Sequence, residues 1–239
     1  MSSSHGVIWE RPERAARGPV PSLTRDDIAT AAVGLADTRG IEAVSMRTLA
    51  QELGVGATSL YRYVARKDEL IELMVDAVMG TDLLFEVRGE WRQDLGSFAH
   101  GLRAMILCHP WMAVPSAGLR SFGPKTAALY ERVLGTVDGL GLEIDDMLVM
   151  VETLDAFVRG RCLEELSEQE AVRRSGLDQE QWMETQTPYI RSLVESGSYP
   201  LLTRVVLDAS GPHDPDRLEH GFDLGLERVL DGLATMLSD

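Results

Sequence analysis

Hydrophobic residues recur every three or four positions along most of the chain, which is the period of helices packed on one face. In the segment 24–39, Ile28, Ala32 and Leu35 share such a stripe, while Thr24 and Gly40 are residue types that begin and end helices. No pair of β-strands stands out, so the predicted fold class is all-α. The other predicted helices span 45–53, 57–64, 67–80, 91–108, 124–139, 145–166 and 218–237.

Two segments depart from this helical pattern. Residues 167–216 contain clusters of Ser, Gly and Pro and are predicted to hold one or two short helices, around Trp182 and over 201–207. Residues 1–23 are predicted to form a flexible N-terminal arm. Its basic residues are of a type that enters a minor groove, although two glutamates dilute their charge and favour simple disorder. These residues are Arg11, Arg14 and Arg17.

The string SMRTLAQELGVGATSLYRYV at 45–64 predicts two helices joined by a tight turn. Gly54 supplies the positive φ of the corner, and the small Ala50 lets the helices cross closely. The outer face of the second helix carries short or hydrogen-bonding side chains at its N-terminal end, which is the end that enters a major groove. Helix starts also bind phosphate, and Arg47 can reach a guanine edge. The DNA-binding residues predicted from this pattern are Ser45, Arg47, Ala57, Thr58, Ser59, Arg62, Tyr63 and Lys67.

Charge is divided unevenly between the two parts of the chain. The 239 residues include 23 Lys and Arg against 38 Asp and Glu, a formal net charge of −15. Residues 1–70 hold nine bases and nine acids, so residues 71–239 carry all of the net negative charge. A polyanion such as DNA is therefore tolerated only by the first part. A helical hairpin inside an unrelated all-α protein remains the alternative interpretation.

Residues 24–80 resemble the DNA-binding domain of the tetracycline-repressor (TetR/AcrR) family of bacterial regulators. The resemblance rests on the core MRTLAQELGVGATSLYRYVARKDEL and on the two tyrosines that precede Lys67. It implies that Tyr61 and Lys67 hold phosphates, while Tyr63 either lies near the bases or packs the helix against its neighbour. The residues that it places at or near base edges are Arg47, Thr58, Ser59, Arg62 and Tyr63.

A weaker resemblance extends through the motifs EWR at 90–92 and HPW at 109–111 to the helix that ends near residue 166. It implies a C-terminal domain of the tetracycline-repressor type, with an all-helical ligand pocket. Most of the large apolar and aromatic residues lie in this part, as in pockets for small ligands, although an ordinary core is the alternative. The predicted pocket residues are Phe98, Leu102, Met105, Trp111, Tyr130, Phe157 and Trp182.

Tetracycline itself is not the expected ligand. Drug-binding members of the family hold a magnesium–drug complex partly through histidines, whereas the matching region here offers Leu83, Leu84 and Ser116. The sequence therefore predicts a bulky, mostly apolar ligand, with no cofactor and no metal site.

The helices at 145–166 and 218–237 are candidates for a subunit contact. Two helices from each of two copies would form a four-helix bundle, and Gly221, Gly225 and Gly232 would let a partner helix approach. A C2 dimer would bind a palindromic operator. Packing within one chain is the alternative. The predicted dimer residues are Leu154, Val158, Phe222, Gly225 and Val229.

Several other classes of protein are excluded by absent patterns. The sequence has no stretch of about 20 apolar residues and no secretory signal, and its two cysteines form no CxxC pair. These features favour the cytoplasm and no membrane partner. No catalytic constellation occurs, so we do not expect an enzyme.

The sequence thus predicts three parts: the arm 1–23, a helix-turn-helix DNA-binding domain 24–70, and a ligand-binding and dimerisation domain 71–239. The predicted function is a homodimeric transcriptional repressor that a small molecule releases from a double-stranded DNA operator. An activator, or a regulator that needs no ligand, is one alternative. The other is an all-α enzyme or carrier with a vestigial helix-turn-helix.

Overall fold

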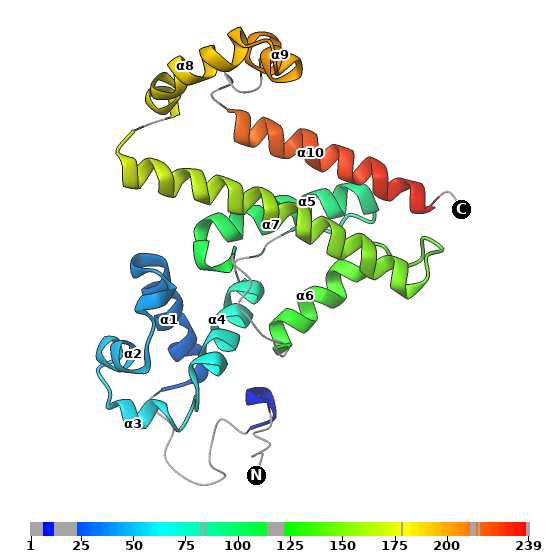
Figure 1. Cartoon of the computed structure of the whole chain (residues 1–239). Helices are drawn as coiled ribbons and strands as arrows, with labels where there is room; N and C mark the ends of the chain where they lie inside the picture. The colour runs from blue at the N-terminus through cyan, green and yellow to red at the C-terminus, as the bar shows by residue number, and fades with distance from the viewer. Residues whose placement is uncertain are drawn as a thin grey trace, which may run out of the picture.

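The computed structural model describes residues 7–11, 23–81, 83, 85–113, 122–177, 179–210, 214 and 216–237. Over these ranges the chain is helical and contains no strand, which confirms the predicted all-α fold class (Figure 1). The helices are α1 (Arg25–Arg39), α2 (Met46–Glu52), α3 (Ala57–Leu60), α4 (Lys67–Thr81), α5 (Trp91–Cys108), α6 (Pro124–Leu134), α7 (Ile144–Ser175), α8 (Gln179–Glu195), α9 (Pro200–Asp208) and α10 (Arg217–Ala234).

Local signals set most helix ends where the sequence predicts them. Thr24 caps α1: its hydroxyl accepts from the Asp27 N–H, while the Asp27 carboxylate accepts from the Thr24 N–H. The hydroxyl of Ser45 likewise accepts from the Thr48 N–H at the start of α2. Gly54, at φ 65°, makes the corner after α2. These short-range signals fix the starts of α1 and α2 and the corner between α2 and α3.

Helix α7 runs nine residues beyond the predicted end at 166, because the apolar stripe stops there but the helix does not. Its last turns are polar and carry ion pairs from Glu170 to Arg173 at 3.2 Å and to Arg174 at 3.5 Å. Gly176 then ends the helix in the left-handed conformation at φ 68°. Loss of the apolar stripe thus marks where burial ends, and the glycine marks where the helix ends.

The buried side chains form two hydrophobic clusters. One cluster runs from Ile8 to Met74 and joins α1, α2 and α3 to the start of α4. The other runs from Val75 to Leu233 and joins the end of α4 to α5, α6, α7 and α10. Figure 1 shows the two lobes with α4 passing from one into the other. We call them the head and the body.

Part of the predicted flexible arm is packed into the head. Residues Ile8–Glu10 form a 3-10 turn, and the side chain of Ile8 is fully buried. The guanidinium of Arg25 donates to the carbonyl oxygens of Ile8 at 2.9 Å and Arg11 at 3.0 Å. Arg11 pairs with Glu69 of α4 at 2.5 Å. A flexible arm over 1–23 is therefore wrong for residues 7–11, and Arg14 and Arg17 lie outside the described residues.

Helices α8 and α9 stand apart from the body (Figure 1). None of their described side chains is buried, and several large apolar ones are at least half exposed. The short helices predicted around Trp182 and over 201–207 are therefore present, and the first spans 17 residues. The exposed apolar side chains include Trp182, Tyr189, Leu201, Val205 and Leu207.

Candidate functional site

Helices α2 and α3 form a tight angle at one end of the head. Leu49 and Ala50 of α2 are buried with Leu60 of α3, so the two helices share one packed interface. The N–H of Val55 donates to the Ala50 carbonyl at 3.0 Å and closes the turn between them. Helix α3 itself is four residues long and continues as a turn through 61–63, so the predicted helix 57–64 is shorter than expected.

The predicted DNA-binding residues divide by exposure. Ser45 is half-buried and its hydroxyl caps α2, while Tyr63 packs against the core of the head. Ser59 is also half-buried. The others lie on the surface, at the start of α2, along α3 and the turn that follows it, and at the start of α4. These exposed residues are Arg47, Ala57, Thr58, Tyr61, Arg62 and Lys67.

Three cations lie on this surface without ion pairs. Among the described residues, no carboxylate lies within ion-pair distance of Arg47, Arg62 or Lys67, although many other basic side chains of the protein are paired. Tyr61 lies between Arg47 and Arg62 in the sequence and is 53 % exposed. Unpaired cations beside hydroxyl and phenol groups can hold phosphates and donate to base edges.

Polar contacts join the head to the body, and the hydrophobic pattern of the sequence does not indicate them. Asp37 of α1 accepts a hydrogen bond from the Trp111 indole at 2.8 Å and lies 2.9 Å from Nδ1 of His109. Asp76 of α4 accepts from the backbone N–H of Thr126 at 2.7 Å. Trp111 therefore lies at this junction, where it lines a hollow of about 740 Å³ between α1 and α7.

Gly123 allows the contact between Asp76 and the backbone of Thr126 to form. A Cβ at this position would lie 2.3 Å from Cγ of Asp76 and 2.6 Å from Cζ2 of Trp9. The N-terminal turn, α4 and the start of α6 thus meet at one point. Lys125 adds an ion pair to Asp26 of α1 at 3.3 Å.

A cavity of about 250 Å³ lies among α4, α5, α6 and α7. It brings together three of the predicted pocket residues, Phe98, Leu102 and Tyr130. Most of the wall is apolar, with a group of polar side chains on one side. The remaining lining residues are Met79, Leu83, Phe122, Thr126, Leu129, Val133, Val151, Glu152, Asp155 and Arg159.

Besides Trp111, three predicted pocket residues lie elsewhere. Met105 is buried in the core of the body. The ring of Phe157 packs on the ring of Phe222 of α10, with the ring centroids 5.6 Å apart. Trp182 lines a second cavity of about 380 Å³. Predicted positions Leu84 and Ser116 fall outside the described residues.

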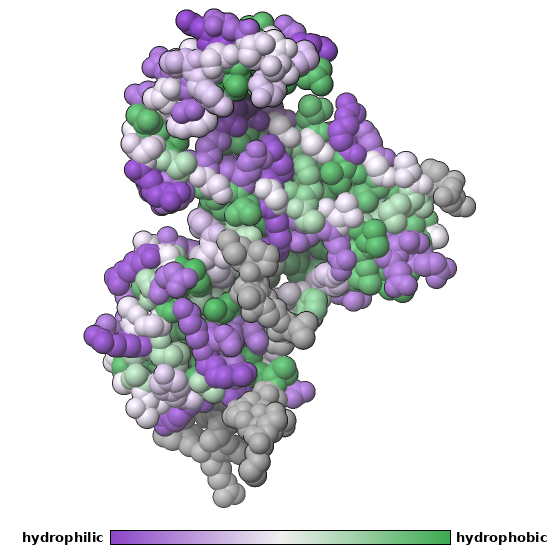
Figure 2. Space-filling model, viewed as in Figure 1, coloured by the Kyte–Doolittle hydropathy of each residue, from purple (hydrophilic) through white to green (hydrophobic). Residues whose placement is uncertain are grey.

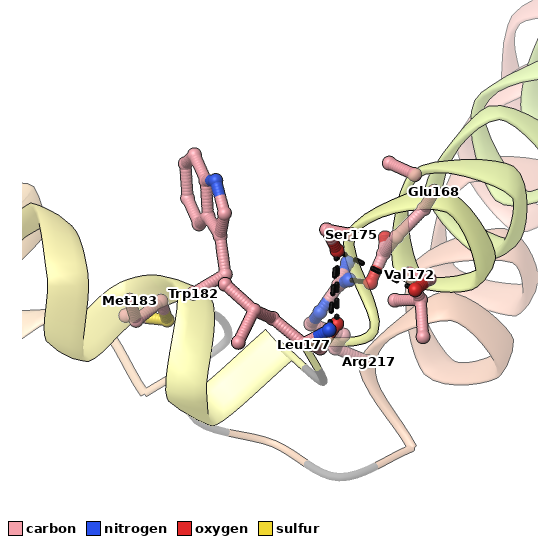
Figure 3. A pocket seen from close by; sticks show the side chains of 8 residues that line it. Glu168, Val172, Ser175, Leu177, Trp182, Met183 and Arg217 are labelled. Atoms are coloured by element: carbon pink, nitrogen blue, oxygen red, sulfur yellow. Dashed lines mark hydrogen bonds and ion pairs between the residues drawn. The ribbon is translucent and has the colours of Figure 1, made fainter.

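The second cavity lies in the angle between the end of α7 and the start of α8. Figure 3 shows Glu168, Val172 and Ser175 on one side and Trp182 and Met183 on the other. Glu168 forms an ion pair with Arg217, so the charged groups at the base of this angle compensate each other.

The predicted dimer residues face inward. Leu154, Val158 and Phe222 are buried within the single chain, which removes them from any surface contact, and Val229 packs on the same core. Gly225 serves the same packing, because a Cβ there would lie 2.8 Å from the Phe157 ring. The intramolecular alternative therefore holds for these positions.

Metal ligands, reactive thiols and membrane-spanning helices are the other features to consider in the described part of the chain. It contains no group of three His, Cys, Asp or Glu side chains placed to hold a metal ion. Burial raises the pKa of Cys162 to about 11, which leaves this thiol protonated and unreactive. No helix in these ranges is long and apolar enough to cross a membrane.

Comparison with known proteins matches both lobes. The model described as "Bacterial regulatory proteins, tetR family" matches residues 28–74, and "Tetracyclin repressor-like, C-terminal domain" matches residues 86–237. The HTH-type transcriptional repressor DrrR1 of Streptomyces coeruleorubidus is 35% identical over 97% of this chain and 85% of its own length.

Solved structures match over nearly the same length. Apo ActR from Streptomyces coelicolor has a TM-score of 0.75 and 29% identity, covering 92% of this chain and 99% of its own. ActR in complex with actinorhodin has a TM-score of 0.72 and 29% identity, covering 90% and 97%.

Proposed function

The chain belongs to the TetR family of bacterial regulatory proteins, and from this premise we propose that it is a transcriptional repressor. It binds operator DNA through the head, and a small molecule bound in the body controls that binding. Its similarity to regulators over nearly its whole length argues against the alternative of an enzyme with a vestigial helix-turn-helix.

The observation that carries this proposal is the surface of α2 and α3. It presents Arg47, Arg62 and Lys67 without ion pairs, in a segment of zero net charge attached to an acidic body. A neutral head that carries unpaired cations, attached to a negative body, orients the molecule toward DNA and leaves the body outside the contact. Thr58 and the half-buried Ser59 supply hydrogen-bonding groups at the start of α3.

The cavity in the body is the proposed ligand site. Its wall includes Met79 of α4, while Leu70 and Leu73 of the same helix belong to the core of the head. A ligand that displaces α4 therefore moves the DNA-binding surface. Release requires that the ligand bind the DNA-free arrangement more tightly than the DNA-bound one. The complex of ActR with actinorhodin supports a small-molecule ligand for a relative.

We propose that the dimer contact uses the outer faces of α7 and α10. On α7, Val149, Ala156, Gly160 and Leu163 are exposed at helical spacing, opposite the buried stripe. Hydrophobic residues gather where Figure 1 places α7 and α10 (Figure 2). On α10, Leu224 is 60 % exposed and Gly232 has no neighbour within 4 Å of an added Cβ. A partner helix can approach closely along these faces.

The domain division follows the two cores. We propose a DNA-binding domain that includes residues 7–11 and 23–74 and a ligand-binding and dimerisation domain from residue 75 onward. The boundary lies inside α4, four residues later than the sequence predicts.

The test is a fluorescence-anisotropy titration of the protein against DNA from upstream of its own coding region, with a random duplex as control. We expect tighter binding to the upstream DNA and a steep loss of affinity with salt. Absence of binding even at low salt would contradict the proposal. The dimer is tested by Gly160→Trp, which should raise the dissociation constant measured by analytical ultracentrifugation.

A further inference from the structure

The cavity among α4, α5, α6 and α7 has one apolar side and one acidic side. Phe98, Leu102 and Val133 contribute hydrocarbon and aromatic surface. The exposed Glu152 and the half-buried Asp155 line the same cavity from α7, three residues apart and therefore neighbours on one helix face. An occupant of this cavity meets an apolar wall and a pair of carboxylates at the same time.

The charge on the acidic side is not balanced. Arg159 also lines the cavity, but its Nε donates to Asp155 at 2.7 Å and its Nη1 donates to the Met112 carbonyl at 3.1 Å. The positive charge of Arg159 is therefore compensated by the carboxylate of Asp155. Among the described residues, Glu152 has no ion-pair partner, so this side of the cavity keeps a net negative charge.

Two aromatic rings lie beside these carboxylates. Phe122 and Tyr130 form an edge-to-face pair with ring centroids 5.5 Å apart, and both line the cavity. Burial raises the pKa of the Tyr130 phenol, and the negative charges of Glu152 and Asp155 raise it further. The phenol thus stays neutral in a negative field. Aromatic rings next to a carboxylate are the surroundings that favour an ammonium group.

We propose that the ligand is an amphiphilic cation, with a flat aromatic body against the apolar wall and a protonated amine beside Glu152. This inference rests on the proposed function, since it names the class of molecule that controls DNA binding. An anion of the same shape would meet the unpaired carboxylate and would have to take Arg159 from Asp155. A neutral molecule would fill the apolar side and leave the acidic side unused.

The test compares three fluorescent probes that share one ring system and differ in charge. They are anthracene-methylamine as cation, anthracene-methanol as neutral form and anthracene-carboxylate as anion. Each is titrated into the full-length protein, and binding is followed by the fluorescence of the rings. We expect the amine to bind about tenfold more tightly than the alcohol, and the carboxylate to bind most weakly.

Two variants with the same change of charge separate a local effect from a general one. Glu152→Gln should abolish the preference for the amine. Glu131→Gln removes a charge from an exposed position next to Tyr130 but outside the cavity wall, and should keep the preference. Equal binding of the three probes, no binding of the amine, or a preference that survives Glu152→Gln would overturn the proposal.

The same preparations are titrated against the upstream DNA and the random duplex. If the protein prefers the upstream DNA but shows no preference for the amine, the ligand class alone is wrong. If it binds neither duplex, the proposed function itself fails.

Discussion

The proposed DNA-binding surface of the head comes from residues 45–67, whereas the wall of the proposed ligand cavity draws on residues from Met79 to Arg159. The first is held by caps, a glycine corner and a packed helix pair within one short segment. The second exists only because four separate helices lie at particular distances. A local surface keeps its shape when its lobe moves, but a cavity between helices changes as they shift. The division suits a rigid contact to DNA and an adjustable contact to a ligand.

The largest expected effect tests how tightly the head is packed. Leu49→Ala leaves a hole at a fully buried position and should lower the free energy of unfolding by about 2–5 kcal/mol. Leu201→Ala makes the same change at a side chain that is 71 % exposed and should stay within about 0.5 kcal/mol. Urea unfolding of both variants measures the contrast, and equal effects would contradict it.

The next effect concerns the junction between the two lobes. Gly123→Ala drives a methyl group into Asp76 and Trp9 and should cost about 1–3 kcal/mol of stability. Gly34→Ala adds the same methyl group in open space on the exposed face of α1 and should stabilise that helix by about 0.5–1 kcal/mol. Thermal unfolding of both variants shows whether each substitution lowers or raises the stability of the protein. If Gly123→Ala were as stable as the wild type, the packing around Gly123 would be looser than the Cβ distances indicate.

A change of similar size, now in the free energy of DNA binding, tests the role of the head. Arg62→Ala removes an exposed, unpaired cation from the turn after α3 and should weaken operator binding by about 1–3 kcal/mol if it contacts a base. Arg191→Ala removes the same charge from an exposed site on α8 and should leave the affinity unchanged. The anisotropy titration compares them, and unchanged affinity in Arg62→Ala would remove this residue from the interface.

The smallest effect is a pH dependence confined to the head. Burial by itself would raise the pKa of Glu69, but hydrogen bonds from the Ala65 N–H and from Arg11 bring it below its ordinary value of 4.5. The ionised Glu69 therefore stabilises the fold above pH 4.5, and this contribution is lost as the pH falls through the lower folded value. The difference in melting temperature between wild type and Glu69→Gln should shrink from pH 7 to below 4.5. A difference that stays constant over this pH range would contradict the prediction.

The sequence predicted the head well because its signals are short-range. Thr24, Ser45 and Gly54 each act on groups within a few residues, so residue type and spacing are enough to place them. The exception is residues 7–11, whose burial depends on Arg25 and Glu69. Ile8 is apolar, but no residue near it in the sequence indicates what would cover it.

The body was predicted less well because one apolar stripe can serve three purposes. Met105 fills the core, Phe157 packs on α10, and Phe98 lines the cavity, yet all three occupy similar positions on their helices. Only the relative placement of α5, α6 and α7 separates these roles. For the same reason, Leu154 and Val158 were assigned to a partner when they face their own chain.

Helix α4 belongs to both cores, and this decides where chimeras between relatives can be joined. A joint at residue 70 would divide Leu73 and Met74 from the packing partners they share with α1. A joint after Thr81 keeps Asp76 with the head, and its donor in the body is a backbone N–H, that of Thr126, which any residue except proline supplies. The whole of α4 is therefore the unit of exchange, and the receiving body must offer a residue as small as Gly123 where Asp76 approaches it.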